Sequence, residues 1–247
     1  MERVLIVQKC PAARMLMSCR RQATSCMPSS RYERAARKAG YCAIAGVDEA
    51  GRGALFGPVF AAAVVLNPDR PIRGLDDSKM LDPERREVLA ARIRERAAAW
   101  AVGASDAFEI DRVNILEAAR LAMRRAVEAL GVCDYLLVDA IQVHVSLPQK
   151  AVIHGDALSF SIAAASILAK TARDRALVAW DQVFPGYGLQ SNKGYSTPDH
   201  IAALNRLGPT WLHRFSFEPV RACAHQDIWN GYPQPRVPKQ AVLFACP

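Results

Sequence analysis

The sequence lacks the features expected of a membrane or secreted protein. Its longest purely apolar run, residues 59–66, is far too short to cross a bilayer. Near the N-terminus, only residues 4–7 form an apolar stretch, which is too short for the core of a secretory signal. The seven cysteines include no C-x-x-C pair, which argues against a disulfide framework or a structural zinc. We therefore expect a cytoplasmic protein without a membrane segment.

Acidic residues are scarce at both ends of the chain. The 247 residues carry a net charge of +8, and residues 1–38 hold nine Lys and Arg against two acids. Residues 221–247 hold three basic residues against one acid, so residues 39–220 have a net charge of −1. A pI near 9.3 is typical of nucleic-acid binding. Because the excess lies at the ends, any such affinity of the middle must come from local placement of charge and from bound metal.

The chain has ordinary globular composition, with 51% hydrophobic and 23% charged residues. It contains no internal repeat. Residues 1–40 lack sustained periodicity, and we expect them to form a disordered basic extension. Two alternative interpretations are a start of translation at Met15, Met17 or Met27, and an Arg-rich transit peptide.

From residue 41 onward, strand and helix patterns alternate. Short apolar runs predict strands at residues 41–47, 59–66, 100–104, 135–139 and 151–153. Helical periodicity and cap residues predict helices from Asp82-Pro83, over 110–130, over 159–180, and from Thr197-Pro198 to Gly208. This order is typical of an α/β domain whose helices flank a central sheet.

Two adjacent carboxylates, Asp48 and Glu49, follow the first predicted strand. Unpaired charge at the end of a buried strand is strongly disfavoured, and a divalent cation bound through oxygen would neutralise it. The following residues, Gly51, Arg52 and Gly53, allow a ligand to approach the backbone. Taken alone, such a pair before a glycine turn is most often a solvated turn.

Further acids make a shared site more specific. Asp139 ends a later strand, and ligands of α/β sheets collect at the carboxyl ends of strands. Asp48 and Asp139 will lie close together if their strands are neighbours, whereas Glu49 faces the other way unless the chain bends. Asp156 is a fourth acid. Four converging carboxylates would repel one another, but with one or two Mg²⁺ they form a ligand set for displacement at phosphorus.

Together these segments resemble bacterial ribonuclease HII, a type 2 ribonuclease H. The matching segments include 44–53 (IAGVDEAGRG), 75–79 (LDDSK), 137–139 (LVD), 164–170 (AASILAK), 193–195 (KGY) and 214–217 (RFSF). The resemblance covers roughly residues 41–221. It implies a ribonuclease H-like mixed sheet flanked by helices, with a catalytic core at 41–190, a small helical C-terminal lobe at 191–221 and a flexible tail at 222–247.

The family's activity then becomes the expected activity. Members use two divalent metal ions, Mg²⁺ or Mn²⁺, to cut the RNA strand of RNA–DNA hybrids. They also cut on the 5′ side of a single ribonucleotide embedded in duplex DNA, leaving 3′-hydroxyl and 5′-phosphate ends. We expect a monomer.

The resemblance also implies roles for individual residues. The metal-binding catalytic acids are Asp48, Glu49, Asp139 and Asp156. The backbone of Gly51, Arg52 and Gly53 contacts the 2′-hydroxyl of the ribonucleotide, which distinguishes RNA from DNA. Tyr195 packs on the sugar of the following deoxynucleotide, and Lys79 and Lys193 contact phosphates.

Three positions depart from the family pattern. Ala140 replaces a glycine after Asp139, a change that is tolerable if the backbone there has an ordinary φ. His154 replaces a lysine, which exchanges a fixed charge for one that titrates near neutrality, although a loop histidine without a role is an equal interpretation. Ala163 replaces a serine. Two alternatives remain: a ribonuclease that needs a run of ribonucleotides, and a catalytically weakened hybrid-binding protein.

The end of the chain offers one further motif. Residues 240–244 resemble a short peptide that binds the bacterial sliding clamp through Gln240, Leu243 and Phe244. The competing interpretation is an apolar tail without a role, because short motifs recur by chance.

Overall fold

The computed structural model describes residues 8–9, 31–75 and 81–223 of the chain. The chain divides into two compact units. The first contains residues 1–52 and 58–173, and the second contains residues 53–57 and 174–247. The lobe expected at residues 191–221 lies wholly within the second unit.

A mixed sheet forms the centre of the first unit, with the strand order β1-β4-β3-β2-β5-β6. The strands are β1 (Gln8–Lys9), β2 (Ile44–Ala50), β3 (Val59–Val65), β4 (Ala99–Ser105), β5 (Tyr135–Asp139) and β6 (Gln149–Val152). Strands β1 to β4 pair in antiparallel fashion, whereas β5 runs parallel to both β2 and β6. The predicted strands therefore all exist, and the last begins before its expected start at residue 151.

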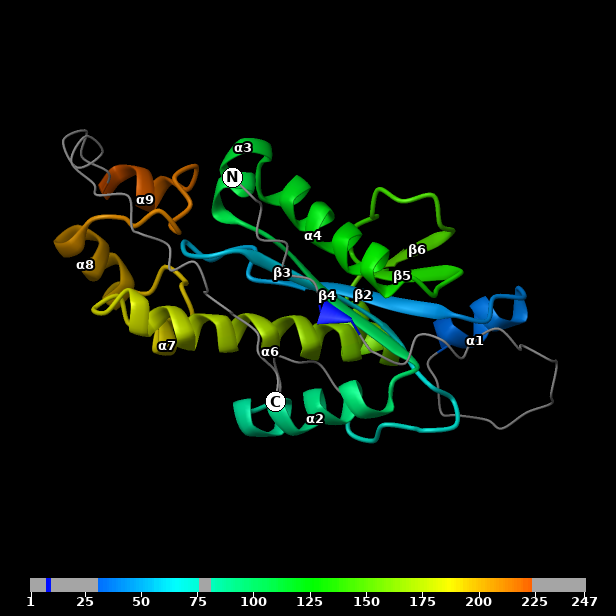
Figure 1. Ribbon diagram of the computed structural model, residues 1–247. Helices are drawn as coiled ribbons and strands as arrows, with labels where there is room; N and C mark the ends of the chain where they lie inside the picture. The colour runs from blue at the N-terminus through cyan, green and yellow to red at the C-terminus, as the bar shows by residue number, and fades with distance from the viewer. Residues whose placement is uncertain (1–7, 10–30, 76–80, 224–247) are drawn as a thin grey trace. The chain divides into compact units, whose positions relative to one another are not determined.

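Helices cover both faces of this sheet (Figure 1). On one face lie α3 (Ala107–Val113) and α4 (Ile115–Leu130), and on the other lie α2 (Pro83–Arg96) and α6 (Phe160–Val183). The start of α6 packs directly on β2, because a Cβ added at Gly46 would lie 2.0 Å from the Ser161 carbonyl carbon. The predicted α/β architecture is thus confirmed.

The predicted cap residues begin and end the helices as expected. The Asp82 carboxylate accepts a hydrogen bond of 2.7 Å from the Arg85 N–H, and Pro83 occupies the first position of α2. α4 stops at Gly131, which adopts a left-handed conformation with φ 70°.

The single helix predicted over residues 110–130 is wrong, because two helices occupy this stretch. Asn114 interrupts it with φ 73°. Its side chain accepts hydrogen bonds from the N–H groups of Leu116 and Glu117, which caps α4. Apolar periodicity runs on across the break and therefore hides it.

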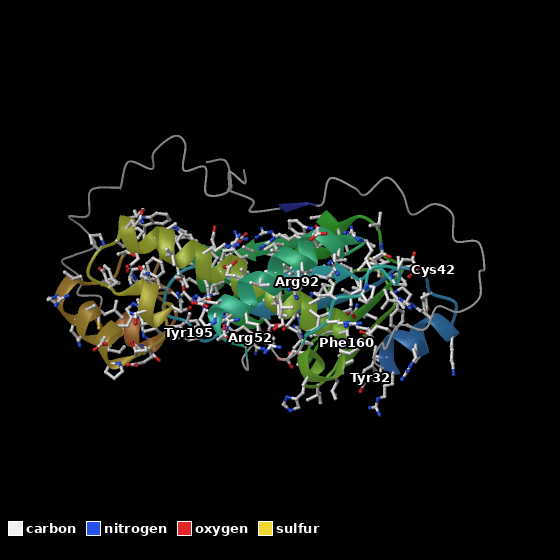
Figure 2. All side chains as sticks on the ribbon, turned by 90° about the horizontal axis from the view of Figure 1, so that it is seen from below. Tyr32, Cys42, Arg52, Arg92, Phe160 and Tyr195 are labelled. Atoms are coloured by element: carbon white, nitrogen blue, oxygen red, sulfur yellow. The ribbon has the colours of Figure 1, made fainter. Side chains whose placement is uncertain are left out.

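The disordered extension predicted for residues 1–40 needs correction in two places, because Gln8–Lys9 form β1, which pairs with β4, and the end of the extension is helical. Residues Arg31–Lys38 form α1, and Glu33 within it is buried. α1 lies beside the start of α6, where Figure 2 labels Tyr32 and Phe160. The Glu33 carboxylate accepts hydrogen bonds from Ser159 Oγ (2.6 Å) and from Ser161 N (3.0 Å). Ala36 of α1 also packs in a core cluster that includes Leu137 and Ile162. Long-range contacts thus order a segment whose own sequence is weakly patterned.

The second unit is helical. After the end of α6 it contains α7 (Leu189–Asn192), α8 (Pro198–Leu207) and α9 (Glu218–Cys223). The segment 53–57 joins it through a β-bridge between Phe56 and His213. Within the described residues, no helix is long and apolar enough to span a membrane.

Candidate active site

Asp48 and Asp139 lie on neighbouring strands. β2 and β5 run parallel, with Val47 opposite Val138, so the two acids follow at the same edge of the sheet. The two strands are therefore neighbours, as the expected closeness of Asp48 and Asp139 requires. Pairing of β2 with β3 continues to Ala50, which keeps Glu49 in strand geometry beyond the last pair with β5.

The acids share a buried, repulsive environment. Asp48 is 4% exposed, and burial raises its pKa well above the ordinary value, with the charges of Glu49 and Asp139 adding to the rise. A hydrogen bond from Ser166 of α6 acts in the opposite direction. Burial likewise raises the pKa of Glu49, which the Arg52 guanidinium at 3.2 Å partly offsets. Burial and mutual repulsion thus make the ionised forms of both acids less favourable than in water.

Asp156 lies on the short helix α5 (Gly155–Leu158), whose first residue is hydrogen-bonded to Asp139. The N–H of Gly155 donates to Asp139 Oδ1 at 2.7 Å. Asp156 is buried, and its Oδ1 accepts from the Ala157 N–H at 3.0 Å. The structure thus ties Asp139 directly to the turn that carries Asp156.

Position 51 requires glycine, both for its backbone conformation and for the space around it. Its φ is 95°, and an added Cβ would lie 2.1 Å from Nε of the buried Arg173 on α6. The guanidinium of Arg173 therefore backs this part of the glycine turn. Arg52 is exposed, and its Nη1 forms an ion pair with Glu49 Oε1 at 3.2 Å.

Gly53, Lys193 and Tyr195 belong to the second unit. An added Cβ at Gly53 would lie 3.9 Å from Cε1 of Tyr195, and the Tyr195 side chain is 37% exposed. Lys193 adopts φ 53°, and its Nζ donates to the Gln190 carbonyl at 2.6 Å. Lys79 lies outside the described residues.

Comparison with known proteins identifies the family. The protein-family model described as Ribonuclease HII matches residues 45–220 of the chain. The chain belongs to the ribonuclease HII family. The ribonuclease HII of Solibacter usitatus is 62% identical over 191 residues, which are 77% of this chain and 84% of that protein. The ribonuclease HII of Moorella thermoacetica is 54% identical over 189 residues, 76% of this chain and 92% of that protein.

Solved structures support the same assignment. Ribonuclease H2 from Pyrococcus horikoshii superposes with a TM-score of 0.63 and 26% identity, over 74% of this chain and 97% of that one. Ribonuclease HII from Archaeoglobus fulgidus, solved in complex with PCNA, has the same TM-score and identity, over 76% of this chain and 99% of that one. The ribonuclease H-like fold is therefore confirmed. The chain is a ribonuclease H-type enzyme, of a family that cleaves the RNA of RNA–DNA hybrids and uses divalent metals.

The acids of this ribonuclease HII suit such metals chemically. All the donors are carboxylate oxygens, which Mg²⁺ and Mn²⁺ prefer. Glu49 Oε2 is buried and has no hydrogen-bond partner, so a cation would satisfy it as well as relieve the repulsion around Asp48. Among the described residues, no three His, Cys, Asp or Glu side chains are already gathered as ligands of one ion.

The family departure at Ala140 is more costly than its sequence suggests. Ala140 has φ 53°, so the condition under which the change would be tolerable, an ordinary φ, is not met. The chain turns sharply there, since the Ala140 N–H donates to the Val152 carbonyl (3.0 Å) and the Ile141 N–H to that of Asp139 (2.6 Å). A left-handed alanine carries a steric penalty that glycine avoids.

His154, the second departure, also has a left-handed backbone, with φ 55°. It is exposed and precedes α5, but its side chain makes no capping hydrogen bond there. The structure therefore gives the imidazole no partner in the helix it precedes. Ala163, the third departure, is buried within α6.

Two residues near the acids received no role from the sequence. Ser166 donates to Asp48, and Arg173 lies against Gly51. Both are polar residues of α6 whose side chains are buried. A buried polar residue normally has a hydrogen-bonding partner, and that was the signal available.

Proposed function

We propose that this ribonuclease HII cuts on the 5′ side of a single ribonucleotide embedded in duplex DNA, as well as within RNA–DNA hybrids, by two-metal hydrolysis. The observation that carries the proposal is the run from Asp48 to Gly53. Buried, mutually repelling carboxylates come directly before a glycine turn, in which a Cβ added at Gly53 would come no closer than 3.9 Å to Tyr195.

The acids would hold the reacting groups. Asp48, Glu49, Asp139 and Asp156 would bind two divalent ions, Mg²⁺ or Mn²⁺. When bound, such ions activate a water and stabilise the departing 3′-oxygen. Hydrolysis forms a bond from the water oxygen to phosphorus and breaks the bond to the 3′-oxygen, which takes up a proton. A 3′-hydroxyl and a 5′-phosphate result.

The glycine turn and Tyr195 would select the site of the cut. The backbone of Gly51, Arg52 and Gly53 would hydrogen-bond the 2′-hydroxyl, which only a ribonucleotide has. Tyr195, partly exposed beside Gly53, would pack on the next sugar and disfavour a second 2′-oxygen. Lys193 and Lys79 would contact phosphates.

One assay tests this proposal. The substrate is duplex DNA with one embedded ribonucleotide, incubated with Mg²⁺, Mn²⁺ or EDTA. We expect a single cut 5′ to the ribonucleotide with either metal, none with EDTA, and none with Asp48→Asn. The control variant Glu128→Gln changes an exposed acid of α4 and should cut normally. Binding without cleavage at every metal concentration would refute the proposal.

A second candidate function is a weakened hybrid-binding protein, which the strained backbone of Ala140 favours. The two candidates differ in the same assay, because the weakened protein would bind the duplex and leave it intact. A ribonuclease that needs a run of ribonucleotides would cut a uniform hybrid but not the single-ribonucleotide duplex.

We also propose a cytoplasmic monomer that contacts the sliding clamp through residues 240–244, which lie outside the described residues. The structural relative from Archaeoglobus fulgidus was solved with PCNA, which supports a clamp partner. A clamp pull-down should recover the parent protein and not Leu243→Ala/Phe244→Ala. Equal recovery of the two would exclude this contact.

A further inference from the structure

Two buried histidines of the second unit have no role in the activity described above. His200 of α8 and His213 are both fully buried, and their Nε2 atoms lie 3.2 Å apart. At this distance one nitrogen must donate and the other must accept. The pair therefore contains exactly one bridging proton when both rings are neutral.

A backbone N–H fixes the direction of this hydrogen bond. His213 Nδ1 lies 2.9 Å from the Thr210 N–H, which can only donate, so Nδ1 accepts and the His213 proton is on Nε2. His213 Nε2–H then donates to His200 Nε2. The His200 proton must consequently be on Nδ1, where it donates to the Tyr195 carbonyl at 2.9 Å. Burial lowers the pKa of both rings, which keeps them neutral.

The chain of hydrogen bonds ends on the residue beside the glycine turn. The Tyr195 carbonyl also accepts from the Thr197 N–H at 2.8 Å, and the preceding Gly194 carbonyl accepts from the Leu55 N–H at 2.7 Å. Leu55 in turn accepts from the Arg214 N–H at 2.9 Å, next to His213. One hydrogen-bonded assembly thus joins residues 53–57, 192–197 and 210–214. The buried histidine pair links the last two of these segments.

We propose that His200 and His213 are positioning residues for substrate selection: their directional chain fixes the Tyr195 backbone, and with it the Tyr195 ring beside Gly53 (Tyr195 is labelled in Figure 2). The inference rests on the proposed function, in which this ring packs on the sugar that follows the ribonucleotide. Neither histidine touches the substrate. Their loss affects the choice between a deoxynucleotide and a ribonucleotide at that position.

The test compares kcat/KM on two substrates, a duplex with one ribonucleotide and a uniform RNA–DNA hybrid. The measured quantity is kcat/KM on the single-ribonucleotide duplex divided by kcat/KM on the uniform hybrid. We expect His200→Leu to lower this ratio about tenfold, because small misplacements of a positioning group are costly. Tyr195→Ala should lower it at least as much. The double variant should match Tyr195→Ala alone, since both changes then act through one ring.

Two further variants separate positioning from folding. In His200→Asn the amide nitrogen can take the place of Nδ1 and donate to the Tyr195 carbonyl, so most of the ratio should return. Val220→Ala, in α9, removes a fully buried side chain of the same unit. It should lower the melting temperature and leave the ratio unchanged.

Three results would overturn the inference. The first is a wild-type ratio in His200→Leu, and the second is additive loss in the double variant. The third comes from ¹⁵N NMR of the histidine rings, if His200 carries its proton on Nε2 or His213 on Nδ1. A wild-type enzyme that never cuts at a lone ribonucleotide would overturn the proposed function as well, whereas unchanged preference in an active His200→Leu overturns this inference alone.

Discussion

Ala140 pairs an alanine side chain with a backbone that suits glycine. Its φ of 53° follows directly after the acid Asp139, so strain is stored next to the proposed metal site. We expect Ala140→Gly to stabilise the protein by about 0.5–1 kcal/mol, because the steric penalty exceeds the added chain entropy. Chemical denaturation measures the change. Ala91→Gly, at an exposed position of α2, is the control and should destabilise.

Gly51 and Gly53 lie two residues apart but should tolerate alanine differently. At Gly51 the new Cβ would lie 2.1 Å from Arg173 Nε at a φ of 95°, so we expect Gly51→Ala to cost about 2 kcal/mol of stability or more. At Gly53 it would make an ordinary contact of 3.9 Å with Tyr195. Gly53→Ala should therefore melt like the parent yet lose cleavage at the ribonucleotide. A wild-type rate in Gly53→Ala would argue against backbone recognition there.

The buried histidines predict how stability depends on pH. Burial, together with the charge of His200, lowers the pKa of His213 to about 3 in the folded protein, whereas an unfolded histidine titrates near about 6.5. Stability from this group is therefore full above pH 6.5 and is lost as the pH falls toward 3. The steepest loss is about 1.4 kcal/mol per pH unit. Denaturation between pH 7 and 4 measures it, and His213→Leu should flatten the curve.

At the level of single residues, the sequence pointed to the acids as candidates, but it did not predict the backbone and hydrogen bonds around them. Asp48, Glu49 and Asp139 stand out because charges ending apolar runs are visible in one dimension. The left-handed φ of Ala140 is not visible, since the turn around it includes a hydrogen bond to Val152 on another strand. The link from His200 to Tyr195 likewise depends on a turn that brings His213 back beside α8.

At the scale of elements, α1 depends on a contact that no local pattern reveals. Glu33 binds Ser159 and Ser161, more than 120 residues further along the chain. The Ser161 N–H belongs to the first turn of α6, where donors have no partner within the helix. Glu33 thus caps the helix that carries Ser166 to Asp48. By contrast, α2 and α8 were predictable because their cap residues are adjacent in sequence.

This anchor gives a prediction for stability. We expect Glu33→Ala to cost about 2–3 kcal/mol, since it removes charge-assisted hydrogen bonds and leaves buried donors unpaired. Glu33→Gln keeps an acceptor and should cost less. Arg34→Ala, exposed on the same helix, should change the denaturation midpoint little. A midpoint of Glu33→Ala equal to that of Arg34→Ala would show that α1 does not support α6.

For the whole molecule, the sequence predicted the layers and the family, since both follow from the order of patterned segments. It did not predict that residues 53–57 leave the first unit to pair with residues 210–214 of the second. Five residues inside a continuous motif carry no sign of a change of unit. The charge distribution was visible, however: residues 39–220 are nearly neutral overall, so the acids form a local concentration of negative charge within a balanced core.

That local concentration should make the stability of the whole protein depend on metal. In EDTA, Asp48 is a buried acid repelled by Glu49 and Asp139, so Asp48→Asn should raise the melting temperature although it abolishes cleavage. With Mn²⁺ at 100 times its dissociation constant, the wild type should gain about 2.7 kcal/mol, since the ion binds only the folded chain. Asp48→Asn should gain much less, whereas Glu128→Gln should behave like the wild type. If Asp48→Asn were less stable than the wild type in EDTA, repulsion would not dominate this cluster, and the case for a charge-neutralising metal would lose its physical basis.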